Sequence, residues 1–137
     1  MTKEMSALRL TSSSSDVALE FSGVEGDYFR VAVVGRDHSA TRRVYAHTDG
    51  KGVARLLSEA ADEWRGWRGC KSWESLEGEL RLELTADRLG HVTLAVRIRS
   101  DPGRADPWQL HAELSLDSGQ LERIAGEAER LWRAEAT

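Results

Sequence analysis

The residues of this chain best suited to acid–base or metal chemistry are its four histidines, His38, His47, His91 and His111. Imidazole binds zinc and exchanges protons near neutral pH, so clustered histidines would indicate a reactive site. Aligning the apolar positions of two neighbouring predicted strands sets His91 opposite Ser115. The same register sets His111 opposite Ala95, roughly 14 Å from His91 along the strands. We therefore expect no metal shared between them.

His47 lies two residues before Asp49, and a histidine beside a carboxylate can transfer protons. A histidine that ends a strand and an aspartate that caps a helix are the commoner structural uses of such a pair. The chain has no G-x-S-x-G motif for a nucleophilic serine. Its single cysteine, Cys70, has neither a disulfide partner nor a histidine near it in sequence. The sequence therefore predicts no catalytic residue, no metal and no cofactor.

Three of the five tryptophans, Trp64, Trp67 and Trp73, fall within ten positions of one another. Trp64 continues the apolar face of a predicted helix, so we expect it in the core. Trp67 and Trp73 bracket a glycine-containing turn. There they either cover the edge of the core or remain half exposed as anchors for a partner.

A charged surface is predicted on the solvent-facing side of three amphipathic strands in the C-terminal half. The expected register places Glu79 opposite Arg97 and Glu77 opposite Arg99, as cross-strand ion pairs. If no helix covers this side, it is either an ordinary solvated face or a docking surface for another protein. The candidate binding residues are accordingly Trp67, Trp73, Arg81, Arg97, His111 and Glu113.

Charge and composition exclude several classes of partner. The 137 residues carry a formal net charge of −4 and a pI near 5.6, whereas nucleic-acid binders usually carry a basic stripe. No run approaches the roughly 20 apolar residues of a membrane helix, and the first residues lack the apolar stretch of a signal peptide. We therefore expect a cytoplasmic protein that binds neither nucleic acid nor membranes.

Four short strands are predicted in the N-terminal half, because apolar and polar residues alternate there. They lie near residues 8–10, 17–21, 29–33 and 39–47. The serine run at residues 12–15 is expected to be a flexible connection. A two-residue turn at Asp37-His38 would set Val31 opposite Val44.

The spacing of apolar residues predicts a helix that begins at Gly52, with Asp49 as its cap and Gly66 at its end. Its apolar face consists of Val53, Leu56, Leu57, Ala60, Trp64 and Trp67. Three alternating strands follow, near residues 76–84, 92–98 and 108–116. Asp117 and Gln120 then match a capping box that opens a second amphipathic helix.

The predicted element order is ββββαβββα, with short turns that favour antiparallel pairing throughout. The class is therefore α+β, with two helices packed on one face of a curved sheet or of two adjoining sheets. A chain of this length forms a single domain, residues 1–137. We expect an ordered core near residues 7–133, a flexible N-terminus at residues 1–6 and a flexible C-terminal tail.

Several short motifs in the C-terminal half are similar to a known family. They are Trp67-Arg68-Gly69, Trp73-Glu74-Ser75-Leu76-Glu77-Gly78-Glu79-Leu80, Gly90-His91-Val92-Thr93-Leu94 and Gly119-Gln120-Leu121. The chain resembles a family of small actinobacterial proteins of unknown function from about residue 20 to residue 132. The resemblance implies a stand-alone bacterial cytoplasmic domain and carries over no activity, cofactor or catalytic residue.

Two functions remain open on the sequence. The first is a non-catalytic protein-interaction module, of the immunity-protein or accessory kind, that binds through the sheet face or the tryptophan-bearing turn. The second is a small-ligand-binding protein or minor enzyme with a pocket near Trp67, Trp73 and His47. A flat face of solvated charges would favour the first function, and a cleft with a perturbed titratable group would favour the second.

Overall fold

The structure is a computed structural model that describes residues 7–47 and 49–136, and the side chains of all of these except residues 134–136. Residues 1–6, which we predicted to be flexible, lie outside the described residues. The backbone of the last helix runs to Ala136, past the predicted end of the ordered core.

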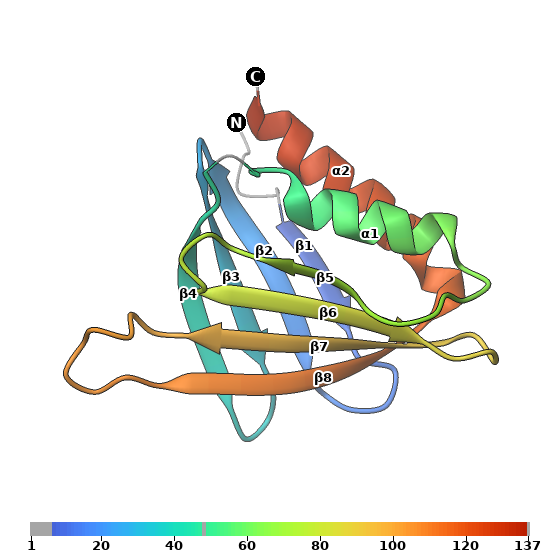
Figure 1. The fold of residues 1–137 in the computed structure, drawn as a ribbon, viewed down its shortest axis with the longest axis horizontal. Coiled ribbons are helices and arrows are strands. Elements are labelled where there is room, and N and C mark those ends of the chain that lie inside the picture. The colour runs from blue at the N-terminus through green and yellow to red at the C-terminus, as the bar shows by residue number, and fades with distance from the viewer. Residues whose placement is uncertain (1–6, 48, 137) are drawn as a thin grey trace.

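Two antiparallel four-stranded sheets and two helices make up the fold (Figure 1). The N-terminal sheet consists, in spatial order, of β1 (Ala7–Thr11), β2 (Ala18–Glu25), β3 (Tyr28–Val34) and β4 (Ser39–Tyr45). The C-terminal sheet consists of β5 (Lys71–Glu74), β6 (Leu80–Ala86), β7 (His91–Arg99) and β8 (Gln109–Asp117). Helix α1 (Gly52–Asp62) connects the sheets, and α2 (Leu121–Ala136) follows β8. The predicted α+β class with antiparallel sheets and packed helices is confirmed, and the structure adds the short strand β5.

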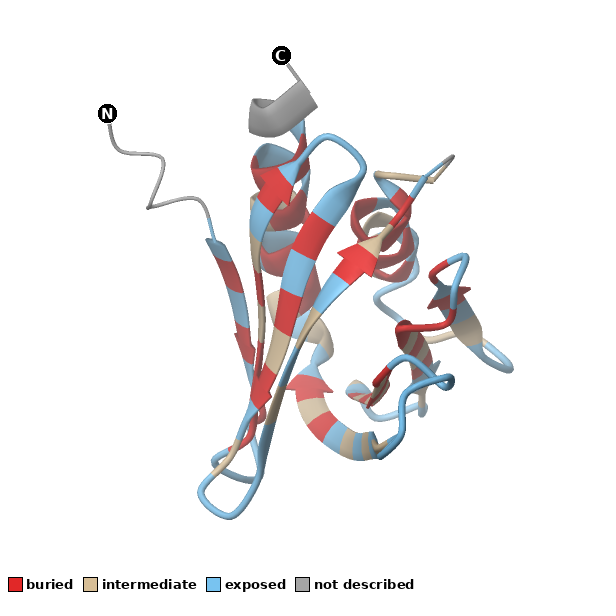
Figure 2. Ribbon diagram, turned by 90° about the vertical axis from the view of Figure 1, so that its left-hand side faces the viewer, coloured by how far each residue is buried: buried red, intermediate tan, exposed pale blue. Residues whose placement is uncertain are grey.

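The strands of the two sheets cross, and both helices lie side by side at one end of them (Figure 1). Helix α2 contacts β1 and β2, whereas α1 contacts β5. Buried and exposed residues alternate along the strands, as Figure 2 shows, because successive side chains point to opposite faces of a sheet. The apolar sides of both sheets and both helices therefore share one core.

Three hairpins pair with a register that differs from the predicted one by two residues. Phe29 lies opposite Val44 because the turn after β3 contains four residues, Gly35–His38, and not two. On β7, Arg97 pairs with Arg81 of β6, and His91 pairs with Asp117 of β8. The predicted pairings Val31–Val44, Glu79–Arg97 and His91–Ser115 are therefore wrong, although each residue of β3 and β7 keeps its predicted face.

The position of Trp64 differs from the prediction that rests on helical spacing, whereas Trp73 follows the first of its two predicted alternatives and covers the core. Helix α1 ends at Asp62, so Trp64 lies beyond its last turn and is 52% exposed. Trp73 lies on β5, is 8% exposed and packs against Phe29, with ring centroids 6.2 Å apart. Trp64 was thus wrongly assigned to the core, and Trp73 is the core residue of this region.

The N-terminus of α1 packs closely against Trp73. The helix starts after Lys51 without a side-chain cap, so the predicted capping role of Asp49 is wrong. The Asp49 carboxylate instead accepts hydrogen bonds from Trp73 Nε1, at 2.8 Å, and from the Arg55 guanidinium. A Cβ atom at Gly52 would overlap Trp73 Nε1, so this close approach requires glycine.

The serine run is an ordered bridge between the sheets. Ser12 is buried, and its hydroxyl accepts a hydrogen bond from the backbone N–H of Ser115 on β8, at 3.0 Å. The Ser13 N–H donates to the Ser115 carbonyl at 2.8 Å. The prediction of a flexible connection is wrong, because β8 supplies partners that the local sequence does not reveal.

The capping box at Asp117 and Gln120 forms as predicted. The Asp117 side chain accepts from the backbone of Gln120, and the Gln120 side chain accepts from the Asp117 N–H at 2.8 Å. The α2 residues Leu121, Ile124, Ala128, Leu131 and Trp132 are buried against the sheets. No helix among the described residues has the length and apolar character needed to cross a membrane.

Candidate binding surface

The candidate site is the side of β6, β7 and β8 that points away from the core. We call it the outer face and define it by Arg81, Glu83, Ala95, Arg97, His111 and Glu113. The strand alternation places these residues outward, because their neighbours Leu82, Leu94, Val96 and Leu114 are buried. Four of the six, Arg81, Arg97, His111 and Glu113, are candidate binding residues predicted from the sequence, and the structure brings those four together.

The outer face has two parallel rows of side chains that run across the strands. Cross-strand pairing aligns Arg81, Arg97 and His111 in one row. The next row consists of Glu83, Ala95 and Glu113. A row with two guanidinium groups therefore lies beside a row with two carboxylates.

A hollow of about 450 Å³ opens on this face, and all six outer-face residues line it together with Val96 and Ala112. The short Ala95 side chain lies between Glu83 and Glu113 on the flanking strands. The floor of the hollow is therefore low at Ala95, while longer charged side chains form its walls. Its volume would accommodate one or two side chains of another molecule.

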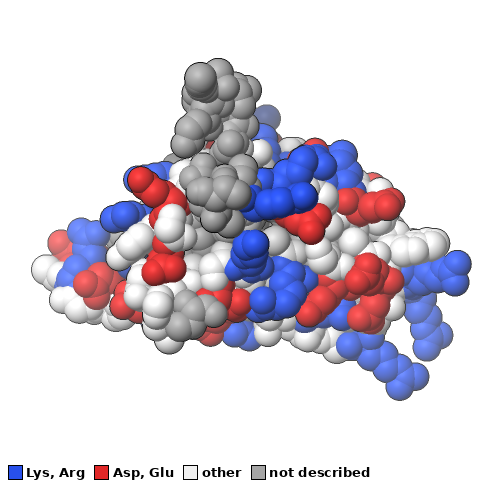
Figure 3. All heavy atoms as spheres, turned by 90° about the horizontal axis from the view of Figure 1, so that it is seen from above, with Lys and Arg blue, Asp and Glu red and all other residues white. Residues whose placement is uncertain are grey.

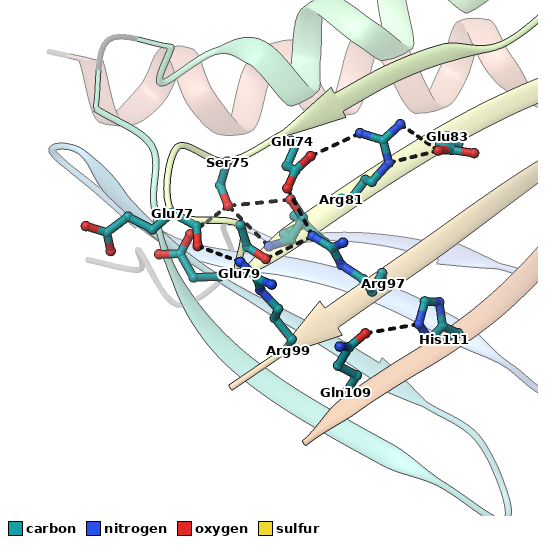
Figure 4. Close-up of polar contacts among 12 residues, drawn as sticks. Glu74, Ser75, Glu77, Glu79, Arg81, Glu83, Arg97, Arg99, Gln109 and His111 are labelled. Carbon is teal, nitrogen blue, oxygen red and sulfur yellow. Dashed lines mark hydrogen bonds and ion pairs between the residues drawn. The ribbon is translucent and has the colours of Figure 1, made fainter. Parts of the chain in front are cut away.

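Glu74 of β5 joins Arg81 and Arg97, the two arginines of the row that also contains His111 (Figure 4). Its carboxylate accepts hydrogen bonds from Arg81 Nη1 and from Arg97 Nη2, each at 3.1 Å. Arg81 Nε also donates to Glu83 at 2.8 Å, and Arg97 Nη2 donates to the Gly78 carbonyl at 3.1 Å. The arginine side chains are thereby held in place before any ligand arrives, which lowers the entropy lost on binding.

The position of Glu74 also shifts its proton affinity. Partial burial raises the pKa of the Glu74 carboxyl, but hydrogen bonds and positive charge from Arg97 and Arg81 outweigh burial and leave it below its ordinary value. A carboxyl with a lowered folded-state pKa stabilises the fold above its unfolded pKa. That contribution disappears as the pH falls through the folded-state value.

We expect Glu74→Gln to reduce the fall in the free energy of unfolding that the wild type shows at acid pH. The variant should be less stable than the wild type at pH 7, and the difference should vanish as the pH falls through the lowered folded-state pKa of Glu74. Urea unfolding at a series of pH values measures this, with Glu77→Gln as a control because Glu77 is an exposed residue of the same region. A wild-type advantage that persists at the acid end would contradict the role given to Glu74.

His111 and Glu113 are the less constrained members of the outer face. His111 Nε2 lies 3.2 Å from Gln109 Oε1, on the same strand. Glu113 is exposed and makes no side-chain hydrogen bond or ion pair with any other residue that the structure describes. Its carboxylate is therefore available to a cation from another molecule.

The ion pairs predicted for this face are replaced by others. Glu79 does not pair with Arg97, because its side chain points inward, where it accepts from the Tyr45 N–H of β4 at 3.0 Å. Arg99 reaches the backbone carbonyl of Glu77, at 3.4 Å, and not its carboxylate. Glu74 was not predicted as a member of this site, because it lies on a strand too short to show an alternating pattern.

The remaining candidate residues lie apart from the outer face and from one another. Trp67 is half-buried, and its Nε1 donates to the Leu84 carbonyl at 3.3 Å. It borders a shallow hollow of about 340 Å³ that neither Trp73 nor His47 lines. His47 stacks on Tyr45 and lies 3.2 Å from Asp27, while Trp73 is enclosed in the core. The structure thus does not bring these three residues into one pocket.

Cys70 and the other histidines form no reactive cluster within the described part of the chain. Burial, followed by the nearby Glu83 carboxylate, raises the pKa of the Cys70 thiol, which disfavours the nucleophilic thiolate. His91 Nδ1 lies 3.0 Å from the Asp87 carboxylate in an exposed turn. Residues 7–47 and 49–136 contain no group of three or more potential metal ligands.

The surface on the helical side carries mixed charges. Figure 3 shows lysine and arginine side chains interspersed with aspartate and glutamate, without an extended area of one sign. Exposed ion pairs such as Arg123–Glu127, at 3.1 Å, contribute to this mixture. Such solvated pairs add little binding energy.

Comparisons with other proteins give a family but no activity. No curated protein matches the chain. The model of a family of unknown function, DUF6228, matches residues 4–135. This agrees with the predicted resemblance to a family of unknown function. Because the match spans nearly the entire sequence, the chain belongs to the family of unknown function DUF6228.

Proposed function

We propose that this protein acts by binding another protein through the outer face of its C-terminal sheet, as an immunity-like or accessory protein would. The observation that carries the proposal is the hollow over Ala95. Its walls combine fixed arginines with the carboxylate of Glu113, which pairs with no residue that the structure describes. Anchor side chains of protein interfaces fill such preformed hollows, and complementary charges around them select the partner.

The partner that fits this surface presents a basic side chain beside a small apolar one. The small side chain would occupy the hollow above Ala95, and the basic one would reach Glu113. Arg81 and Arg97 are already neutralised in part by Glu74 and Glu83, so the uncompensated charge of the hollow is negative. A lysine or arginine of the partner therefore gains more here than an acidic residue does.

The setting that we propose is the cytoplasm of a bacterium, and of an actinobacterium in particular. Motifs such as Trp67-Arg68-Gly69 and Gly90-His91-Val92 support the bacterial origin by resemblance. A single exposed thiol, Cys70, fits a reducing compartment.

Quantitative affinity capture tests the proposal with variants of the outer face. Ala95→Arg fills the hollow, and Glu113→Arg reverses the charge that is available to the partner. We expect each variant to recover at least about tenfold less of the principal partner from native cells than the wild type recovers. Mass spectrometry with isotope labels measures the recovered amounts.

The matched control is Arg30→Glu, which reverses an exposed charge on β3 of the N-terminal sheet. It should capture as much partner as the wild type. Thermal unfolding of all three variants must first show that they are folded. If Ala95→Arg and Glu113→Arg are folded and recover the wild-type set of proteins, the outer face is not the binding surface.

A further inference from the structure

One edge of the C-terminal sheet presents unpaired backbone groups. In an antiparallel pair, the N–H and C=O groups of alternate residues point toward and away from the neighbouring strand. The Trp108 carbonyl, just before β8, accepts from Ser100 after β7, so even-numbered positions face β7. Ser115 bonds away from β7, to Ser12 and Ser13. The register of β7 and β8 is unbroken between these two points.

The backbone groups of Gln109, His111 and Glu113 therefore point away from β7. We call them the free edge of β8. Apart from the pairing of β7 with β8, the backbone groups of these three residues form no hydrogen bond to the backbone of any residue that the structure describes. The serine bridge already completes this edge at Ser115, so the free edge ends at Glu113.

The other sheet edges are less suited to adding a strand. On β4, the Tyr45 N–H is taken by Glu79, and the Arg42 side chain donates to the Arg99 carbonyl. β1 and β5 have only five and four residues. β8 has nine, and β1 and β5 also contact the helices. Long unprotected edges are the ones that pair with other chains.

The core-facing side chains beside the free edge are incompletely covered. On β7, the core-facing residues Val96 and Ile98 are buried, but their β8 neighbours Ala112 and Leu110 are only partly buried. A strand added at the free edge would cover both of these apolar side chains. Burial of their exposed carbon surface would favour the added strand.

We propose that the free edge of β8 pairs with the free edge of a second copy of this chain, antiparallel and centred on His111. Each of Gln109, His111 and Glu113 would then exchange two backbone hydrogen bonds with its counterpart. Leu110 lies opposite Ala112 of the second copy, and Gln109 lies opposite Glu113 of the second copy. An amide facing a carboxylate and an apolar pair facing inward make the segment complementary to itself. The hollow over Ala95 stays open in this dimer, but the Glu113 carboxylate then faces Gln109 of the second copy. The inference therefore shares Glu113 with the proposed function, and it is tested separately through the oligomeric state of the protein.

Opposite charges at position 109 test this register. Gln109→Glu sets two carboxylates opposite each other twice in the dimer, whereas Gln109→Lys sets two opposite charges together twice. We expect a dimer dissociation constant about fivefold higher for Gln109→Glu than for the wild type, and about fivefold lower for Gln109→Lys. Sedimentation equilibrium over micromolar to millimolar concentrations measures the constants.

Stability within one copy follows the opposite order. Gln109 lies opposite Arg99 on β7, so Gln109→Glu gains an attraction inside the copy and Gln109→Lys gains a repulsion. A general effect on folding would thus favour the glutamate variant, while the proposed dimer favours the lysine variant. Comparing Gln109→Glu with Gln109→Lys therefore distinguishes an effect on the dimer from an effect on folding.

His111→Pro removes the central outward donor without removing a hydrogen bond between β7 and β8, because proline is tolerated where an edge N–H faces solvent. We expect it to be monomeric at concentrations where His111→Ala is dimeric. A wild-type protein that stays monomeric to millimolar concentration would overturn the proposal. So would a dimer whose dissociation constant is the same for both variants at position 109. If His111→Pro does not fold, the two substitutions of Gln109 still test whether the dimer forms through this edge.

Discussion

Replacing Trp73 with alanine should lower the free energy of unfolding by about 3–5 kcal/mol, the cost typical of truncating a buried aromatic side chain. Trp73 is 8% exposed and packs on Phe29, which also contacts Phe21 and Trp132. The substitution opens a cavity beside this cluster. It also leaves the Asp49 carboxylate without one of its hydrogen-bond donors. Urea unfolding measures the loss.

The matched control for this substitution is Trp64→Ala, nine positions earlier in the sequence. Trp64 is 52% exposed and contacts the Arg65 guanidinium across its ring, at 5.0 Å. Its truncation should change the unfolding free energy by no more than about 0.5 kcal/mol, as surface substitutions usually do. Equal losses for the two variants would contradict the placement of Trp73 in the core and of Trp64 at the surface.

The second large effect is expected from Glu79→Ala, at about 3 kcal/mol of unfolding free energy. Glu79 is 4% exposed, and its carboxylate accepts from the Ser75 hydroxyl at 2.6 Å and from the Tyr45 N–H at 3.0 Å. It therefore joins the turn before β6 to β4 of the other sheet. Truncation removes the acceptor of the Tyr45 N–H and the nearer acceptor of the Ser75 hydroxyl, and polar groups that lose a partner at a largely buried position are costly.

Glu77→Ala is the control, because Glu77 is an exposed residue two positions from Glu79. It should change the unfolding free energy by about 0.5 kcal/mol or less. Glu79→Gln retains an acceptor oxygen for Tyr45 and should cost less than Glu79→Ala. Chemical denaturation of the three variants gives the order. If Glu79→Ala unfolds with the wild-type free energy, the carboxylate does not hold the sheets together.

All the strands except β5 were predictable from the sequence, but their pairing was not. Alternation along β7 fixes which residues face the core, because a shift of one residue would turn every side chain over. A shift of two residues leaves every side chain on the same face, so the alternation of apolar and polar residues cannot distinguish the two registers. All three predicted hairpin registers differ from the structure by two residues for this reason. Turn length decides the choice, and the turn at Gly35–His38 is longer than we assumed.

The sequence was enough to predict which side chains of β6, β7 and β8 face outward at the candidate surface. It was not enough to predict the hydrogen bonds and ion pairs among them. The outward positions of Arg81, Arg97, His111 and Glu113 follow from alternation alone. The bridging role of Glu74 depends on β5, whose four residues are too few to show a period. The inward turn of Glu79 depends on a donor from β4, which is distant in sequence.

The tryptophans show where helical spacing ceases to apply. Trp64 fits the periodicity of α1, but α1 ends at Asp62, and a residue beyond the last turn is free to point outward. Trp73 stands alone on a short strand, so no neighbouring apolar residue indicates its burial. Contacts with α1 and β3, which come from other parts of the chain, bury it.

Site-specific photo-cross-linking in native cells tests the central claim, that the outer face binds another protein, most directly. A photoreactive residue in place of Glu113 lies at the rim of the hollow, and the same residue in place of Arg30 lies on the exposed side of the other sheet. The proposed function predicts a covalent adduct with one principal protein from position 113 and none with that protein from position 30. Equal adducts from both positions, or an adduct from position 30 alone, would contradict it.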